Sequence, residues 1–246
     1  MRPILPDSVA IVFIASFPAG PWQTNCYLVA TEPGAECVVI DPGMDAVDGV
    51  QELVAEHGLK PVAVLLTHGH LDHTFSVTPL CRGNGAACWV HPDDRALLAD
   101  PFRAMGPDAF ELVRRLGGST TFTEPDDVRE LVDGAEVEVA GLRLGALHAP
   151  GHTPGSTMFR TAHPDAEVDS VVFSGDVLFA GSIGRTDLPG GNHADMLSSL
   201  RTKVSPLPDS VAVLPGHGPQ TTMARERAQN PYLQPSRLQA AQPFEE

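Results

Sequence analysis

The feature that most constrains this chain is a cluster of histidines directly after an apolar segment. Residues 61–73 read PVAVLLTHGHLDH, and the continuous apolar run predicts a strand that is buried on both faces. Alternate residues of an extended chain share a face, so His68, His70 and Asp72 are expected to project together, while a turn brings in His73. Imidazole and carboxylate groups at this spacing are typical metal ligands.

Three later segments share one design, in which an apolar strand ends in a glycine-containing turn with a single ligand-type residue. The turn PGHT carries His152, the turn SGD carries Asp176 and the turn PGHG carries His217. Each turn alone is a weak signal, but together with the histidine cluster they predict a metal site built from several strand ends. Two divalent cations suit this set of nitrogen and oxygen ligands. His148 is expected to have a structural role, and the role of His193 stays open.

The rest of the chain predicts short strands joined by turns, because Gly and Pro number 23 each. Residues 100–125 are rich in both and predict a long excursion that could cover a site. Helices are expected over 45–57, 75–81 and 192–203, the last with Asn192 as its N-cap. Further strands are expected at 9–17, 26–30, 37–40, 87–90, 136–139, 142–148, 158–160, 171–173 and 211–214.

These elements form two strand-rich halves and predict an α+β fold with two facing mixed sheets and helices outside. The length of 246 residues suits one compact domain. We therefore expect a single domain over 1–246, in which the Pro- and Gln-rich segment 230–246 is a loosely packed tail.

Charge and hydropathy exclude several classes of partner. Sixteen Lys and Arg against 31 Asp and Glu give a net charge of −15, which disfavours nucleic acid as a partner. No apolar run reaches the length of a membrane span. The run at 9–17 lacks a small-x-small cleavage site and is rich in β-branched residues, so it predicts a strand and not a signal peptide. We expect a cytoplasmic monomer or homodimer, with no membrane partner and with four reduced cysteines that are mostly buried.

The motifs HxHxDH, PGHT, GD and PGHG, in this order, resemble those of the metallo-β-lactamase fold superfamily. The family fold is a four-layer αββα sandwich with metals at one edge of the two sheets. Within it, the chain is similar to the glyoxalase II-like hydrolases through GDVLF at 175–179, IGRTD at 183–187 and PGHG at 215–218. The resemblance implies a first metal held by His68, His70 and His152, a second held by Asp72, His73 and His217, and Asp176 as a bridge between them.

The resemblance also implies a reaction, the hydrolysis of a thioester such as S-lactoylglutathione or a related hydroxyacyl-thiol by a binuclear metallohydrolase. A metal-bound hydroxide attacks the acyl carbonyl. Asp72 and Asp176 are the expected catalytic carboxylates, and Asp72 orients the attacking oxygen. Arg185 matches a basic residue that holds the glutathione part of the substrate, so it is the expected substrate-binding residue. Zinc is the favoured metal, with iron and manganese as alternatives.

Two departures from the family leave the carrier thiol open. Thr186 and Asp187 stand where aromatic residues are expected, and residues 218–246 are too few for the helical domain that supplies further glutathione contacts. Another low-mass thiol is therefore an alternative carrier. An iron-dependent persulfide dioxygenase is the main alternative function, although LPGG at 188–191 favours the hydrolase. A lactonase or another ester hydrolase of the same fold is a further alternative.

Overall fold

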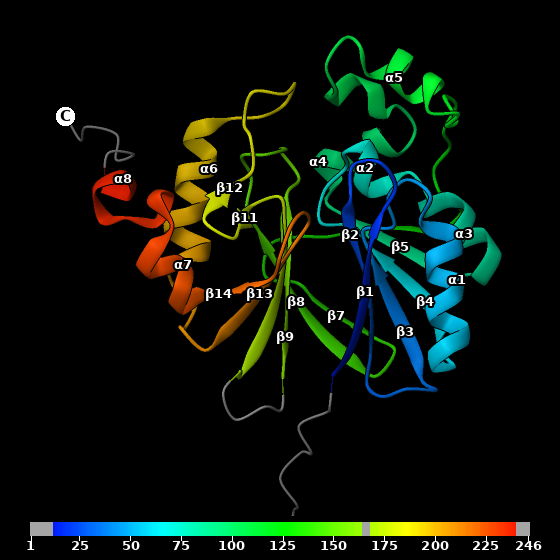
Figure 1. Cartoon of the computed structure of the whole chain (residues 1–246), viewed down its shortest axis with the longest axis horizontal. Helices are drawn as coiled ribbons and strands as arrows, with labels where there is room; N and C mark the ends of the chain where they lie inside the picture. The colour runs from blue at the N-terminus through cyan, green and yellow to red at the C-terminus, as the bar shows by residue number, and fades with distance from the viewer. Residues whose placement is uncertain (1–11, 164–167, 240–246) are drawn as a thin grey trace, which may run out of the picture.

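The computed structural model describes residues 12–163 and 168–239, and it consists of two β-sheets packed face to face with helices on both outer sides (Figure 1). This arrangement confirms the α+β four-layer sandwich expected from the sequence. Residues 9–11 of the first expected strand and residues 240–246 of the expected tail lie outside the described residues. The division into one domain with a tail stays a prediction.

The first sheet has the strand order β1-β2-β3-β4-β5-β6. Strands β1 to β3 form an antiparallel meander, whereas β3 to β6 are parallel. Its strands are β1 (Phe13–Ala19), β2 (Thr24–Ala30), β3 (Glu36–Ile40), β4 (Lys60–Leu65), β5 (Ala87–Val90) and β6 (Val128–Glu130).

The second sheet has the order β14-β13-β10-β9-β8-β7 and is antiparallel except between β10 and β13. A separate hairpin, β11 (Leu178–Phe179) and β12 (Ser182–Ile183), follows β10. The strands of the second sheet are β7 (Glu136–Val139), β8 (Leu142–His148), β9 (Thr157–Ala162), β10 (Ser170–Gly175), β13 (Val211–Pro215) and β14 (Thr221–Thr222).

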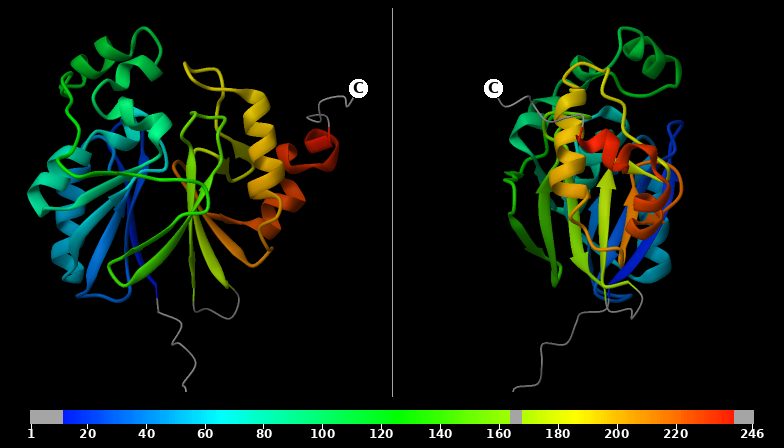
Figure 2. Two further views of the ribbon diagram at one scale, coloured as in Figure 1. Left: turned by 180° about the vertical axis from the view of Figure 1, so that it is seen from behind. Right: turned by 90° about the vertical axis from the view of Figure 1, so that its left-hand side faces the viewer.

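Three apolar cores separate the four layers. The middle core lies between the sheets and includes Ile40, Leu65, Phe159 and Phe173, all at most 1% exposed. One outer core lies between the first sheet and the helices α1 (Ala46–His57) and α3 (Val77–Asn84). The other lies between the second sheet and the helices α6 (His193–Ser199) and α7 (Met223–Gln229). Figure 2 shows these helices on the outer side of that sheet. Burial of these large side chains on both faces of each sheet is the main stabilising contribution.

Helix α1 matches the helix expected over 45–57, whereas the helix expected over 75–81 is α3, which begins at Val77 and ends at Asn84. Helix α1 ends at Gly58, whose φ of 68° is the left-handed conformation that glycine adopts readily. Asn192 caps α6 by accepting from the main-chain N–H groups of Ala194 and Asp195. The expected helix over 192–203 is in fact α6 followed by a π-helical turn (Leu200–Val204), which no local pattern had indicated.

The remaining short elements lie around the ends of the sheets. None of the helices in the described residues is long and apolar enough to cross a membrane. The short elements are α2 (Leu71–Thr74), α4 (Pro92–Arg95), the 3-10 turns Ala96–Leu98, Pro101–Ala104 and Pro231–Leu233, α5 (Ala109–Arg115) and α8 (Pro235–Gln239).

Candidate metal centre

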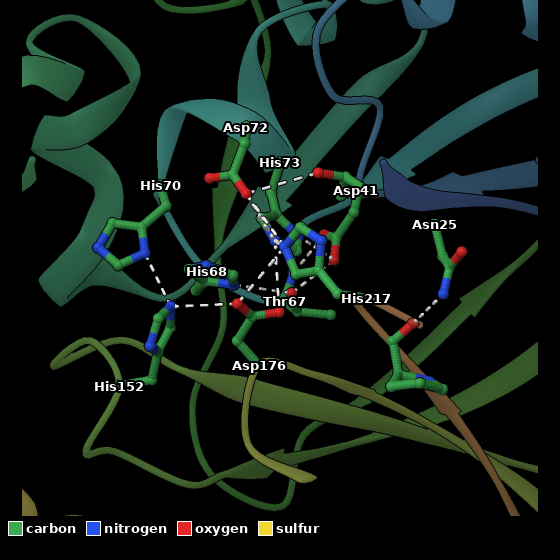
Figure 3. A network of polar contacts seen from close by, with 12 residues as sticks. Asn25, Asp41, Thr67, His68, His70, Asp72, His73, His152, Asp176 and His217 are labelled. Carbon is green, nitrogen blue, oxygen red and sulfur yellow. Dashed lines mark hydrogen bonds and ion pairs between the residues drawn. The ribbon is translucent and has the colours of Figure 1, made fainter. Parts of the chain in front are cut away.

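The seven ligand-type residues singled out in the sequence meet at one edge of the sandwich (Figure 3). They come from the turn after β4, from α2, from the loop between β8 and β9, and from the turns that follow β10 and β13. Both sheets therefore contribute, which explains why residues as far apart as 68 and 217 lie together. The sheet core behind them holds the strand ends in place.

Three histidines form the first group. One ring nitrogen each of His68, His70 and His152 lies within 4.8 Å of the others, and all three side chains are buried. Nδ1 of His70 is 2.8 Å from Nε2 of His152. The imidazole planes are close to perpendicular, so the ring edges, which carry the lone pairs, meet in the space between them.

Hydrogen bonds fix the tautomers of two of these rings. His152 donates from Nδ1 to the carbonyl oxygen of Arg185 at 2.8 Å, which leaves the lone pair on Nε2. The Thr67 hydroxyl donates to Asp41 Oδ2 at 2.6 Å, so it accepts from Nδ1 of His68 at 3.1 Å. Nε2 of His68 is then a bare lone pair, and this buried atom has no hydrogen-bond partner.

Asp72, His73 and His217 form the second group, again with ligand atoms within 4.8 Å of one another. Asp72 Oδ2 is 3.1 Å from Nε2 of His217 and 3.5 Å from Nε2 of His73. His217 donates from Nδ1 to the carbonyl oxygen of Trp22 at 3.1 Å, so its Nε2 also presents a lone pair to the site.

Asp176 lies between the two groups and contacts both. Its Oδ2 is 3.5 Å from Nε2 of His152 in the first group and 3.6 Å from Nε2 of His217 in the second. Its Oδ1 is 3.4 Å from Nε2 of His73 and has no hydrogen-bond partner. A carboxylate at this place can serve a cation on either side.

The pKa shifts describe two neutral imidazoles of the first group, His68 and His70, close to an ionised Asp176. Burial, and then the neighbouring His152, lowers the pKa of His70 to about 3. Burial would raise the pKa of Asp176, but the charge of His73 outweighs it and keeps the pKa below its usual value. Neutral imidazole and ionised carboxylate are the forms in which these side chains bind metal.

His73 shows in addition that the site favours positive charge. Burial acts to lower the pKa of this imidazole, yet the carboxylates of Asp72, Asp176 and Asp41 raise it well above its usual value. Three carboxylates around one buried ring stabilise a cation at this place.

The residues present fit divalent metal ions. Nε2 of His68 and Oδ1 of Asp176 are buried and have no hydrogen-bond partner. Burying such atoms is unfavourable unless a cation binds them. Nitrogen and oxygen donors of this kind suit zinc, iron and manganese alike, so the donor set does not select one metal.

Sequence reasoning missed the supporting carboxylate of Asp41, which follows β3. It accepts from the main-chain N–H of Thr67 at 2.8 Å, and its Oδ2 lies 2.9 Å from Nδ1 of His73. Its φ of 51° is a strained conformation for a residue other than glycine. The signal in the sequence was the run DPG at 41–43, which indicated a turn but not the orientation of the side chain.

A cleft of about 710 Å³ opens over the ligand groups. Its wall is largely apolar and includes Met105 and Leu112 from the segment 100–125, together with Ile183 and Leu188 on the opposite side. Helix α5 of that segment lies above the half of the sandwich that contains the first sheet, beyond α2 and α4 (Figure 1). The expected excursion therefore forms part of the cleft wall.

Arg185 lines the cleft, and among the described cleft residues it is the one Lys or Arg. Its guanidinium donates from Nε and Nη2 to both carboxylate oxygens of Asp187, at 2.8 and 2.6 Å. The sequence singled out Arg185 but not this pairing, in which Asp187 neutralises the cation expected to hold the substrate.

The other candidate residues lie outside the two groups. His148 stacks on His91 with ring centroids 3.9 Å apart and planes 8° apart, and with Asp93 these two offer ligand-type atoms within 4.8 Å of one another that belong to neither group. His193 contacts Thr186 at 3.4 Å, and neither residue lines the cleft.

Comparison with known proteins gives a family and several relatives. The family model described as the metallo-β-lactamase superfamily matches residues 19–217. An uncharacterized protein of Mycobacterium tuberculosis is 42% identical over 91% of this chain and 98% of its own length. The hydroxyacylglutathione hydrolase GloC of Haemophilus influenzae is 34% identical, over 89% of this chain and 97% of its own length.

Three solved structures extend the comparison. The B3 metallo-β-lactamase BLEG-1 has a TM-score of 0.76 at 36% identity and covers 90% of this chain and 99% of its own. TTHA1623, described in a di-iron-bound form, has a TM-score of 0.69 at 38% identity and covers 90% of this chain and 100% of its own. ETHE1 from Myxococcus xanthus has a TM-score of 0.69 at 26% identity and covers 90% of this chain and 84% of its own.

Proposed function

The chain belongs to the metallo-β-lactamase superfamily, and we propose that within it the protein is a glyoxalase II-like hydrolase of thioesters. S-lactoylglutathione, or the hydroxyacyl thioester of another low-mass thiol, is the proposed substrate. The observation that carries the proposal is the position of Asp176, whose carboxylate contacts His152 in one ligand group and His217 in the other. The similarity to GloC, named for hydroxyacylglutathione hydrolysis, supports it.

We assign the two ligand groups to two metal ions. The assignment places His68, His70 and His152 on the first ion, Asp72, His73 and His217 on the second, and Asp176 on both. Divalent ions bound there would supply a water with a pKa lowered towards neutrality and a Lewis acid for the acyl oxygen. Zinc is the proposed metal, and the di-iron form of TTHA1623 makes iron the alternative to test first.

The side chains around the reacting carbonyl have distinct tasks in this proposal. Asp72 turns Oδ2 towards the two imidazoles of its group, and its Oδ1 accepts the proton of the attacking water. His152 and His217 keep their Nε2 lone pairs in the site, because both Nδ1 protons are held by main-chain carbonyls. A thiolate leaves more readily than an amine, so thioester cleavage needs no further acid.

The cleft wall offers apolar surface beside the reacting group. Leu112 from α5 faces the side of Ile183 and Leu188, and these apolar groups border the polar ligand cluster. An apolar wall next to a few charged groups is the usual composition of a small-molecule site. The acyl and thiol parts of the substrate are expected to lie along it.

Persulfide oxidation by an iron-loaded site, the main alternative from the sequence, is the second candidate, and the similarity to TTHA1623 in a di-iron-bound form supports testing iron. The first experiment therefore runs two assays side by side. Free thiol released from S-lactoylglutathione is measured with zinc-loaded protein, and oxygen uptake on glutathione persulfide is measured with iron-loaded protein. The H152A variant is the matched control in both, and a β-lactam is included because of the similarity to BLEG-1.

Thiol release by the wild type and not by H152A, without oxygen uptake, is the expected result. Oxygen uptake without thiol release would overturn the hydrolase in favour of the dioxygenase. Cleavage of the β-lactam alone would overturn the thioester assignment.

A further inference from the structure

Asp94 is a buried carboxylate outside both ligand groups. It lies in α4, directly after β5, and its exposed fraction is 0%. A carboxylate at such a place is unfavourable unless several donors satisfy it. The origin of those donors therefore indicates its role.

Three donors from two distant turns reach Asp94. Its Oδ2 accepts from the main-chain N–H of Gly69 at 2.8 Å and from Thr153 Oγ1 at 2.6 Å. Its Oδ1 accepts from the main-chain N–H of Gly155 at 2.8 Å. Gly69 separates the first two histidines of the three-histidine group, and Thr153 directly follows the third. One carboxylate thus joins the two turns that carry the whole group.

The close approach of both turns depends on glycine. A Cβ atom on Gly155 would lie 2.6 Å from Cγ of Asp94, and one on Gly69 would lie 2.9 Å from the Asp94 carbonyl oxygen. Thr153 is held further by Ser156, whose Oγ accepts from the Thr153 N–H at 3.0 Å. The connection is therefore tight on both sides of the carboxylate.

We propose that Asp94 is the positioning residue of the three-histidine group and sets its metal affinity without touching the metal. The proposal rests on the ligand assignment made above. It goes beyond that assignment because it predicts a loss of affinity for only one of the two bound metals. Outer carboxylates of this kind orient metal ligands, and their removal costs about 10- to 100-fold in affinity.

The second group is anchored independently of Asp94. Helix α2 carries Asp72 and His73. Two residues after it, Ser76 ties the chain to the turn after β3, donating from N to the Pro42 carbonyl at 3.0 Å and from Oγ to the Gly43 carbonyl at 2.6 Å. The turn of His217 is held by the β2 segment through main-chain and side-chain bonds of Asn25. Asp41 differs from Asp94 in supporting both groups, because it contacts His73 directly and His68 through Thr67.

The test measures Zn²⁺ binding to the full-length apoprotein by competition with a chromophoric chelator. The D94N variant replaces one acceptor oxygen by an NH₂ group that faces an N–H donor. We expect D94N to raise the Kd of one zinc equivalent by about 10- to 100-fold and to leave the Kd of the other within about threefold of the wild-type value. T153V removes one donor and is expected to weaken the same equivalent less, whereas T153S keeps the hydroxyl and is expected to bind as the wild type does.

Double variants identify which equivalent is affected. D94N combined with H152A should bind zinc no more weakly than H152A alone, because both changes act on one site. D94N combined with H217A should lose tight binding at both sites. Equal weakening of both equivalents by D94N, or equal effects in the two double variants, would overturn the proposal.

Thermal melting of each apoprotein, followed by circular dichroism, distinguishes a general loss of folding from a specific loss of metal affinity. If D94N does not fold, the comparison of T153V with T153S carries the same test, and equal zinc affinity in these two would overturn the proposal. The readout is independent of substrate. A protein with the expected zinc pattern but without thioesterase activity would refute the proposed function and leave the role of Asp94 standing.

Discussion

His152 donates from Nδ1 to the main-chain carbonyl of Arg185 at 2.8 Å, which joins a ligand-type imidazole to the segment that forms the cleft wall. The main chain of Arg185 fixes the tautomer of the histidine, while its side chain faces the cleft. A displacement of this segment therefore changes both the ligand group and the substrate wall.

Gly184, next to Arg185, makes that coupling testable. A Cβ atom there would collide with the carbonyl oxygen of Asp176 and lie 3.3 Å from Cγ of His152. We expect G184A to push the segment away from both residues and to lower kcat/KM for the thioester by about 100-fold, the cost of a misplacement of about 1 Å. G83A is the matched control, because a Cβ on Gly83 meets nothing within 4 Å. An unchanged rate in G184A would show that the segment is not coupled to the site.

Asp176 is expected to be required for the full complement of two metals and for turnover. Its carboxylate contacts both ligand groups, so D176A should lower the bound metal from two equivalents towards one and reduce kcat by about 10²- to 10³-fold. Metal content is measured by elemental analysis after gel filtration. D48A changes an exposed carboxylate on α1 and should alter neither quantity. Two retained equivalents and a normal rate in D176A would disprove the bridging assignment.

Metal removal is expected to destabilise the fold. The buried lone pairs of His68 and Asp176 have no protein donor to replace a cation. A ligand at a hundred times its Kd stabilises the folded state by about 2.7 kcal/mol. The Tm of metal-saturated protein should therefore be about 5–10 °C higher than that of chelator-treated protein. Differential scanning calorimetry measures this shift, and D176A should show a smaller one. Identical Tm values in the wild type would contradict the metal site.

The positions of the ligands could be predicted from sequence because each is a local signal, a strand followed by a turn with one imidazole or carboxylate. The expected strand at 87–90 coincides with β5, and Asn192 caps α6 as expected. The edge strand β6, with the sequence VRE, escaped prediction because it is short and polar.

The supporting carboxylates could not be predicted, because their partners are far away in the chain. Asp94 accepts from residues 25, 59 and 61 positions away, and only the packing of the two sheets brings these turns to it. Its sequence context, HPDD at 91–94, indicates a helix start and carries no sign of burial. The pairing of Arg185 with Asp187 was missed for a different reason, since a spacing of two residues on a loop does not determine orientation.

The cysteines give a prediction that concerns the fold alone. All four are free and buried, as expected from the sequence. Burial raises the pKa of Cys37 to about 12 and that of Cys26 well above its usual value, so these thiols stay protonated at pH 8. We expect a thiol reagent such as dithionitrobenzoate to react with none of them in the native protein and with four after denaturation. A fast-reacting thiol in the native protein would contradict the buried positions.

The ion pair of Arg185 and Asp187 leads to a prediction about the carrier thiol. The Arg185 guanidinium holds the pKa of Asp187 at about 2, so the carboxylate is ionised and offsets the one Lys or Arg charge among the described cleft residues. A glutathione thioester carries two carboxylates and therefore gains little from this cation. D187N should raise kcat/KM for S-lactoylglutathione by about two- to fivefold, the range of an exposed ion pair, and R185Q should lower it. The lactoyl thioester of N-acetylcysteamine, a neutral carrier, should respond to neither change. Equal effects of D187N on both carriers would mean that Asp187 acts on the reaction itself and not on the choice of thiol.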